Sequence, residues 1–210
     1  MTAADTRRKL LDGAIDTVRA EGLAGTSARS IARTAGVNQA LIFYHFDTVD
    51  ALLAEAARRA TEERVQRYRA RFATVATLGE LLAAGRVLWS EEEALGNATV
   101  LAQLLAGAQT SPALAEGTAA ALGLWSAEVE TVLRRVLPDS PLAGLLDPVA
   151  TAQAVSAAFA GLSLFGAIGA TPDALGQMEA LVALVDDLGP LERRLVARRL
   201  ARMTDGAQRP

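Results

Sequence analysis

Residues 38–46 hold the side chains of this 210-residue chain that are best suited to specific recognition chemistry. The run Asn38-Gln39-Ala40-Leu41 is followed, after one residue, by the run Phe43-Tyr44-His45-Phe46. Asn and Gln amides can pair with the edge of an adenine, and Ala and Leu can contact the methyl group of a thymine. This order of residue types is typical of a helix whose first turn faces base edges in DNA.

Two helices separated by a sharp turn must position this segment. Thr26 or Ser27 is suited to cap a helix that ends before Gly36. Gly36 supplies the left-handed residue that a sharp turn needs, and Asn38 caps the next helix, which is expected to end near Phe46. The pattern therefore predicts a helix-turn-helix, which lays its second helix in the major groove of DNA.

The two helices offer contacts to the DNA backbone as well as to the bases. Ser27 and Arg29 stand at the start of the first helix of the pair, where hydroxyl, guanidinium and backbone N–H groups can reach a phosphate. Ile42 and Phe46, four residues apart, are expected to anchor the second helix inward. The predicted DNA-binding residues are Ser27, Arg29, Asn38, Gln39, Ala40, Leu41, Phe43, Tyr44 and His45.

The rest of the chain shows helical periodicity and no sustained alternation of period two, so the predicted fold class is all-α. An apolar stripe from Leu10 to Val18 marks a first helix that is expected to end at Gly22. Later helices begin at capping residues, as at Ser111-Pro112 and at the predicted capping box Thr77-Leu78-Gly79-Glu80. The expected helices beyond the helix-turn-helix cover about 48–72, 78–95, 98–109, 112–137, 148–169, 173–188 and 191–203, and the expected domains are 1–47 and 48–210.

Composition limits the possible function classes. Hydrophobic residues make up 51% of the chain and aromatic residues 4%, which indicates an Ala- and Leu-rich helical core. The absence of cysteine and the single histidine, His45, exclude disulfides, thiolate chemistry and a His-based metal site. The sequence has no nucleophile elbow, phosphate-binding loop or paired His and carboxylate. We therefore expect no enzymatic activity, no metal and no cofactor.

Charge is distributed unevenly along the chain. Residues 1–71 hold 12 Lys and Arg against 9 Asp and Glu, whereas residues 72–210 hold 9 against 15. A basic N-terminal part joined to an acidic body fits a nucleic-acid-binding module attached to a body with another role.

The segment 148–172 is long and apolar enough to fit either a membrane span or a core helix. It is dominated by Ala and Gly, contains Gln153, Ser156 and Ser163, and lacks flanking Lys or Arg, so we expect a buried helix at a subunit interface. Small residues around Gly161 would let two copies approach closely, which favours a homodimer. The N-terminus has no apolar signal core, so we expect a cytoplasmic protein without a membrane association.

The larger domain holds scattered aromatic side chains that suit either a plain core or a ligand pocket. The expected ligand is a small and mostly apolar molecule. The acidic triplet Glu91-Glu92-Glu93 is expected at an exposed helix end. The predicted ligand-binding residues are Phe72, Trp89, Gln103, Trp125 and Phe159, with Gln103 as a polar anchor.

Three stretches, Leu10 to Gly22, Ile31 to Val37 and Phe43 to Phe46, carry a resemblance to a known family. With them, residues 7–52 resemble the N-terminal domain of the TetR/AcrR family of repressors. The resemblance implies a three-helix DNA-binding domain, a connecting fourth helix, and a helical domain that binds a ligand and forms a homodimer. It also implies that a small molecule entering the larger domain releases the operator.

The chain departs from the family pattern at three positions. Where the resemblance implies a small or hydroxyl residue, a tyrosine and a lysine near phosphate, this chain has Leu41, Phe43 and Val49. Each lost phosphate contact lowers the affinity for any DNA sequence.

From the helix-turn-helix and the resemblance we predict a ligand-responsive transcriptional regulator, a repressor that binds a palindromic operator as a homodimer and is released by a small, mostly apolar effector. The alternative is a helical interaction or ligand-binding protein of the same fold with weakened or lost DNA binding.

Overall fold

The computed structural model describes residues 2–167, 173–189, 191–192 and 195. Within these ranges the chain is helical and contains no strand, which confirms the predicted all-α fold. Most of the predicted helix over 191–203 lies outside the described residues. The helices are α1 (Ala3–Gly25), α2 (Ala28–Ala35), α3 (Ala40–His45), α4 (Val49–Ala73), α5 (Leu78–Ala94), α6 (Asn97–Ala108), α7 (Pro112–Val136), α8 (Pro148–Ala167) and α9 (Ala174–Asp186), with a 3-10 turn, η1, at Leu137–Asp139.

Capping side chains start several helices at the predicted places. The hydroxyls of Ser27 at α2 and Thr48 at α4 each accept a hydrogen bond from the N–H three residues later (3.1 and 3.0 Å). At α5, Thr77 accepts from the Glu80 N–H, but the Glu80 carboxylate accepts from the Ala76 N–H (2.6 Å) and not from that of Thr77. The predicted capping box is therefore only half formed, because the carboxylate satisfies the preceding residue instead.

The first helix passes through the residue at which it was predicted to stop. Gly22 adopts φ 70 and ψ 171, which breaks the regular helix, yet the chain turns once more and α1 ends at Gly25. After the kink, the Leu23 N–H donates to Oε1 of Gln103 on α6 (3.1 Å). Gln103 thus supplies an acceptor at the point where the regular helix is interrupted. This contact explains why a residue predicted to anchor a ligand lies against α1.

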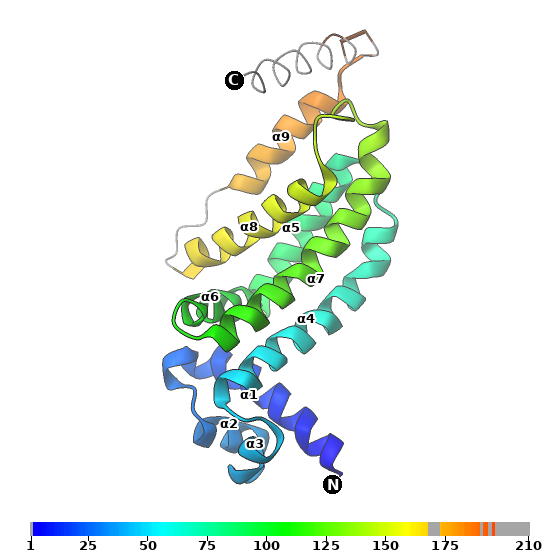
Figure 1. The fold of residues 1–210 in the computed structure, drawn as a ribbon. Helices are drawn as coiled ribbons and strands as arrows, with labels where there is room; N and C mark the ends of the chain where they lie inside the picture. Colours follow the sequence, from blue (N-terminus) through cyan, green and yellow to red (C-terminus); the bar gives the residue numbers. More distant parts are fainter. Residues whose placement is uncertain (1, 168–172, 190, 193–194, 196–210) are drawn as a thin grey trace, which may run out of the picture.

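The helices form an elongated molecule with α1, α2 and α3 at one end and α9 toward the other (Figure 1). α4 leaves the N-terminal helices and runs along α7 through the body of the protein. The two helices approach closely at Gly117, where an added Cβ would lie 2.4 Å from Cβ of Ala54. A side chain at position 117 would therefore push α7 away from α4.

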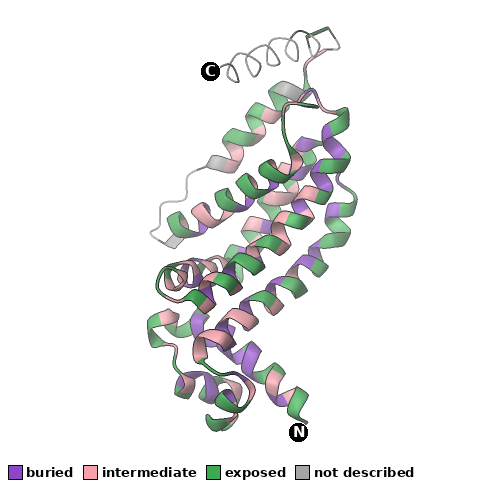
Figure 2. Ribbon diagram, viewed as in Figure 1, coloured by how far each residue is buried: buried purple, intermediate pink, exposed green. Residues whose placement is uncertain are grey.

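Two apolar clusters lie within the described part of the chain, and α4 contributes to both. The N-terminal cluster contains Leu10 of α1, Ile31 of α2 and Leu52 of α4, and the body cluster contains Tyr68 and Phe72 of α4. Figure 2 shows the buried residues along the inward-facing sides of the helices, including most of the length of α4. The predicted domain boundary between residues 47 and 48 falls just before α4 and stays a prediction.

The apolar helix α8 is largely uncovered within one chain. The span Pro148–Gly166 is the one helical segment of the described residues that is long and apolar enough to cross a membrane, and only 17% of its apolar 18-residue stretch is buried. Leu164 and Phe165 near its end are exposed, and α9 exposes two further apolar side chains, Leu181 and Leu184. Burial of this helix, as expected from the sequence, thus requires something beyond the described part of the chain.

Candidate DNA-binding surface and ligand cavity

The turn between α2 and α3 has the geometry that the sequence predicts. Gly36 takes a left-handed conformation (φ 64, ψ 38) and its N–H donates to the carbonyl of Arg33 (3.2 Å). α2 also packs tightly on α1, since a Cβ added at Gly13 would lie 2.9 Å from Cβ of Ala35. The N-terminal helices thus hold α3 in a fixed direction.

α3 turns one side inward and leaves its first turn exposed. Ile42 and Phe46 are buried in the N-terminal cluster, as predicted. Asn38 precedes α3 and its side-chain oxygen accepts from the Ala40 N–H (2.8 Å), so it caps the helix locally. The exposed residues before and within the first turn are Asn38, Gln39 and Ala40.

The remaining predicted DNA-binding residues divide into exposed and half-buried side chains. Phe43 is 55% exposed and Tyr44 is 77% exposed. Leu41 is half-buried and packs against the N-terminal cluster, and His45 is half-buried with its ring edge-on to that of Tyr44 at 4.9 Å between centroids. An exposed aromatic pair beside an exposed polar turn gives α3 one face that can meet a groove and its flanking backbone.

The start of α2 adds polar groups beside this face. Ser27 and Arg29 are both exposed, as expected for backbone contacts. The Ser27 hydroxyl already accepts from the Ser30 N–H (3.1 Å), so its capping role occupies one of its lone pairs. Its position at a helix N-terminus still favours a nearby phosphate.

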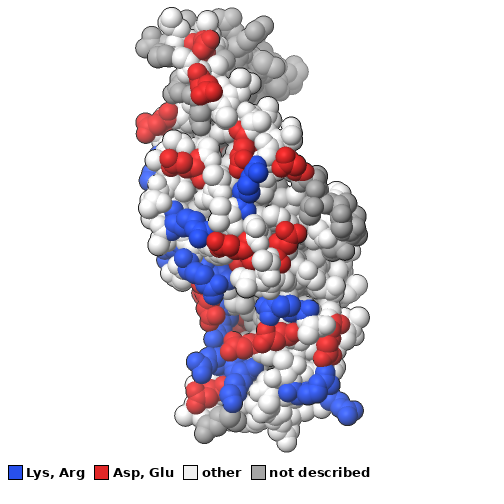
Figure 3. Space-filling view, turned by 180° about the vertical axis from the view of Figure 1, so that it is seen from behind, with Lys and Arg blue, Asp and Glu red and all other residues white. Residues whose placement is uncertain are grey.

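Several other charges of the N-terminal helices are engaged within the protein. Arg7 of α1 pairs with Glu55 of α4 and lies over the Phe46 ring, 4.9 Å from its centroid. Arg33 pairs with Glu21 at 2.5 Å. Figure 3 shows that, on the face it draws, basic side chains gather over the lower half of the molecule but alternate with acidic ones. On this face, therefore, the basic side chains do not form a continuous positive surface.

A cavity of about 140 Å³ lies in the body, bounded by residues from α4 to α9. Four of the five predicted ligand-binding residues, Phe72, Trp89, Trp125 and Phe159, line it. The rings of Trp89 and Phe159 meet edge-on, with 5.8 Å between centroids. Gln103 does not line this cavity, because it is held by α1 as described above.

A buried acidic residue gives the cavity a polar edge that the sequence reading missed. Glu92 is only 7% exposed and its carboxylate accepts hydrogen bonds from Arg64 (2.7 Å) and from the Asn97 amide (3.1 Å). The prediction of an exposed acidic triplet is therefore wrong for Glu92. The sequence does indicate that Glu92 is buried, because it lies four residues after Leu88 and Leu88 lies seven residues after Leu81, which places all three on one helix face.

The phenol of Tyr68 completes this polar group. Its hydroxyl donates to Glu92 at 3.4 Å. Burial raises the pKa of Tyr68, and the nearby carboxylates of Glu91 and Glu92 raise it further. The phenol therefore stays neutral and acts as a donor. The cavity is mostly apolar, and its two charged lining residues, Arg64 and Glu92, form an ion pair with each other. Such a cavity suits a molecule that is mainly apolar and carries few polar atoms.

Comparison with known proteins agrees with both parts of the molecule. The family described as "Bacterial regulatory proteins, tetR family" matches residues 10–56. An uncharacterized HTH-type transcriptional regulator of Mycobacterium tuberculosis is 28% identical over 130 residues, which are 62% of this chain and 67% of the relative.

Solved structures extend the similarity to the body. A proposed TetR-family regulator from Rhodococcus sp. superimposes with a TM-score of 0.70 at 23% identity, covering 87% of this chain and 98% of the other. The multidrug binding protein EbrR, solved with imidazole, superimposes with a TM-score of 0.61 at 28% identity, covering 85% and 93%. Residues 10–56 thus match the tetR family, and the body has the fold of solved regulators, which together with the helix-turn-helix geometry supports a TetR-family transcriptional regulator.

Proposed function

We propose that this regulator is a cytoplasmic repressor that binds a palindromic operator as a homodimer and leaves it when a small, mostly apolar effector fills the body cavity. The observation that carries the proposal is the continuity of α4. Its first turns pack on the N-terminal helices through Leu52, and its later turns line the cavity through Phe72. A ligand that displaces one end of a rigid helix changes the position of the other.

The nature of the effector is argued from the cavity walls. Aromatic and aliphatic side chains dominate, and the buried Glu92 is already neutralised by Arg64. A strongly charged ligand would have to break this pair, which is costly in a buried site. The relative EbrR is described as a multidrug binding protein and was solved with imidazole, which fits a cavity of this kind in the same fold.

The dimer is argued from the uncovered apolar surface of α8 and α9. Exposed apolar patches of this kind mark interaction surfaces in soluble proteins. Two copies related by a twofold axis would cover the same patch on each other, and they would present two copies of α3. Half-sites of the operator are then expected about 34–36 Å apart, or one turn of DNA.

The alternative is an interaction or ligand-binding protein of the same fold with weakened DNA binding. It is favoured by the three apolar residues Leu41, Phe43 and Val49, which offer no polar group to a phosphate. It predicts an intact ligand response without sequence-specific DNA binding.

Selection of bound DNA from a random pool, repeated at low and high salt, distinguishes the two functions. The repressor should enrich a palindrome, and Gln39→Ala should relax the preference at one position of each half-site, with a cost of about 1–3 kcal/mol. Arg29→Ala should weaken binding to all sequences alike. A pool without any enriched palindrome contradicts the repressor and leaves the alternative.

A further inference from the structure

A second cavity, of about 370 Å³, lies where the N-terminal helices meet the body. α1 contributes Ile15 and Arg19, α4 contributes Arg67, and α6 and α7 contribute Leu104 and Thr118. None of the aromatic side chains of the body cavity reaches it. Residues shared by both cavities, among them Thr61, Arg64 and Leu101, form the wall between them.

Thr118 places an unsatisfied hydroxyl at this cavity. Its side chain is 3% exposed and Oγ1 has no hydrogen-bond partner among the described residues. Other hydroxyls on helices donate to the carbonyl four residues earlier, as Thr17 does to Gly13 (2.7 Å) and Thr131 to Ala127 (2.9 Å). A buried polar group without a partner is destabilising unless a molecule in the cavity satisfies it.

The outer part of the cavity carries more positive than negative charge. The side chain of Arg67 makes no ion pair or hydrogen bond within the described residues, although its charge acts on Glu91. Arg19 is held by Asp16 (2.5 Å) and by the Asn97 amide oxygen (3.1 Å).

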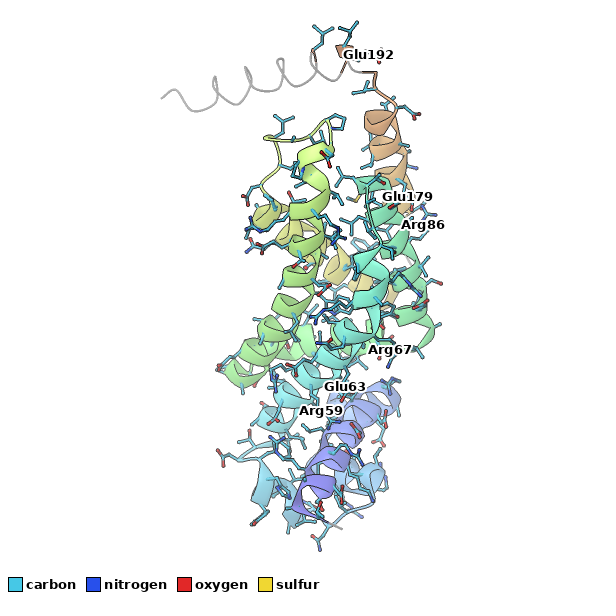
Figure 4. All side chains as sticks on the ribbon, turned by 90° about the vertical axis from the view of Figure 1, so that its right-hand side faces the viewer. Arg59, Glu63, Arg67, Arg86, Glu179 and Glu192 are labelled. Carbon is cyan, nitrogen blue, oxygen red and sulfur yellow. The ribbon has the colours of Figure 1, made fainter. Side chains whose placement is uncertain are left out.

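The other charged residues of the lining are paired with opposite charges. Glu63, the acidic residue of the lining, is neutralised by Arg59 (3.0 Å), and Arg64 is neutralised by Glu92. Figure 4 shows Arg59, Glu63 and Arg67 in succession along α4, with Arg59 at the level of α1.

The N-terminus of α6 opens onto the same space. Gly96 is the cap residue, has a left-handed conformation and provides no side-chain hydrogen bond to the first turn. Its neighbours Leu95 and Asn97 line the cavity, and Arg19 packs against it, 3.3 Å from where a Cβ would stand. The first N–H groups of a helix and its dipole attract an anion.

We propose that this interdomain cavity binds a small organic anion, a carboxylate or a phosphate monoester, separately from the effector in the body cavity. Its charged group lies near Arg67, Arg19 and the start of α6. Its apolar part lies inward, beside Ile15 and Leu104, with an acceptor atom that takes the Thr118 hydroxyl hydrogen. Since the walls come from α1 as well as from α4, α6 and α7, the bound anion braces the DNA-binding helices against the body.

Calorimetric titration of the full chain, without DNA, with benzoate and with phenyl phosphate tests the site. Sodium chloride at equal ionic strength serves as the blank. We expect saturable binding of at least one of the two anions, weakened about tenfold by Arg67→Gln, as for a lost charge-assisted contact. Thr118→Val should also weaken binding. Arg58→Gln and Thr131→Val, which change an exposed ion pair and a hydroxyl bonded to its own helix, should not.

Thermal unfolding of the ligand-free variants gives a second readout. Thr118→Val removes a hydroxyl that has no partner, so its Tm should equal or exceed that of the parent protein. Trp89→Leu, in the body cavity, should leave the anion affinity unchanged. The proposal is overturned if neither anion binds at millimolar concentrations, if Arg67→Gln and Thr118→Val bind as the parent does, or if Thr118→Val lowers the Tm. None of these results depends on finding an operator or an effector.

Discussion

Phe43 presents an exposed ring on the surface of α3 expected to meet DNA, where the family pattern implies a phenol that bonds to a phosphate. Phe43→Tyr adds this hydroxyl without disturbing the packed side of α3, which Ile42 and Phe46 provide. We expect binding to all DNA sequences to tighten by about 0.5–1.5 kcal/mol, the worth of one neutral hydrogen bond. The slope of affinity against salt should stay unchanged, because a neutral group displaces no counterion. Fluorescence anisotropy over a salt series measures both quantities.

Val49→Lys differs from Phe43→Tyr in that it adds a charge, so the two variants should differ in the salt dependence of DNA binding. A lysine at the start of α4 adds a charge near the backbone, so the salt slope should steepen by about one unit as affinity rises. If both variants bind DNA as weakly as the parent protein, the direction that we propose for this face of α3 is wrong.

The raised pKa of Tyr68 predicts that the folded protein becomes less stable at alkaline pH. Burial, with the nearby carboxylates, raises its pKa above the usual value of 10.0, so the folded protein retains the proton after the unfolded chain has lost it. The stabilising contribution is fully present below pH 10.0 and is lost as the pH rises above this value. Urea unfolding from pH 8 to pH 11 should show a decrease in the free energy of unfolding that is smaller in Tyr68→Phe.

Tyr44, the other tyrosine of the chain, provides the matched control because it is exposed. Tyr44→Phe should keep the alkaline decrease of the parent protein. Identical pH profiles for the parent and Tyr68→Phe would show that the buried phenol does not cause the effect.

At the scale of helices, the close approach of α1 and α2 depends on Gly13. Gly13→Ala would bring a Cβ to 2.9 Å from Cβ of Ala35 and to 3.1 Å from its backbone, so α2 must shift. We expect a loss of about 1–3 kcal/mol in the free energy of unfolding, the usual cost of overpacking. DNA binding should weaken as well, because α2 holds the turn that directs α3. Chemical denaturation and anisotropy measure the two effects.

Gly123 of α7 is the matched control, because an added Cβ would meet nothing within 4 Å. Gly123→Ala should stabilise the protein by about 0.5–1 kcal/mol through the higher helix propensity of alanine. Equal effects at both positions would show that α1 and α2 are not closely packed at Gly13.

The helices show which features a sequence can reveal and which it cannot. Capping at Ser27 and Thr48, and the turn at Gly36, are local, so residue types within one turn suffice to predict them. The partner of Gln103 is not local, since it lies 80 residues away at a kink in α1. For the same reason the pairing of Glu92 with Arg64 was missed, although its helix face was readable. A charged triplet favours an exposed helix end until a partner from another helix is known.

At the scale of the whole molecule, both cavities meet along α4, with Thr61 and Arg64 in their common wall. One cavity lies within the body and the other between the body and α1. A ligand in the first is expected to move α4, whereas one in the second is expected to hold α1 against it. Under the proposed function, the two ligands would therefore oppose each other in their effects on DNA.

The exposed apolar side chains of α8 and α9 predict that charges placed on this surface will prevent dimerisation. Leu181 and Leu184 are 65% and 66% exposed and lie three residues apart on α9. The double substitution Leu181→Glu and Leu184→Glu puts charges into the proposed dimer interface while leaving the described core untouched. In sedimentation, the parent protein should behave as a dimer and the variant as a monomer. Val87→Glu, at an exposed apolar position on α5, should remain dimeric.

Loss of the dimer should also weaken operator binding, although α3 lies at the other end of the molecule. Two linked recognition helices bind two half-sites with an effective concentration that a monomer lacks, so operator affinity should decrease by about 100-fold or more. Binding to a single half-site should change little, because α3 and the N-terminal cluster are far from the substitutions in the fold (Figure 1). A monomeric variant that retained full operator affinity would separate dimerisation from recognition, and a variant that remained dimeric would show that this apolar surface has another partner.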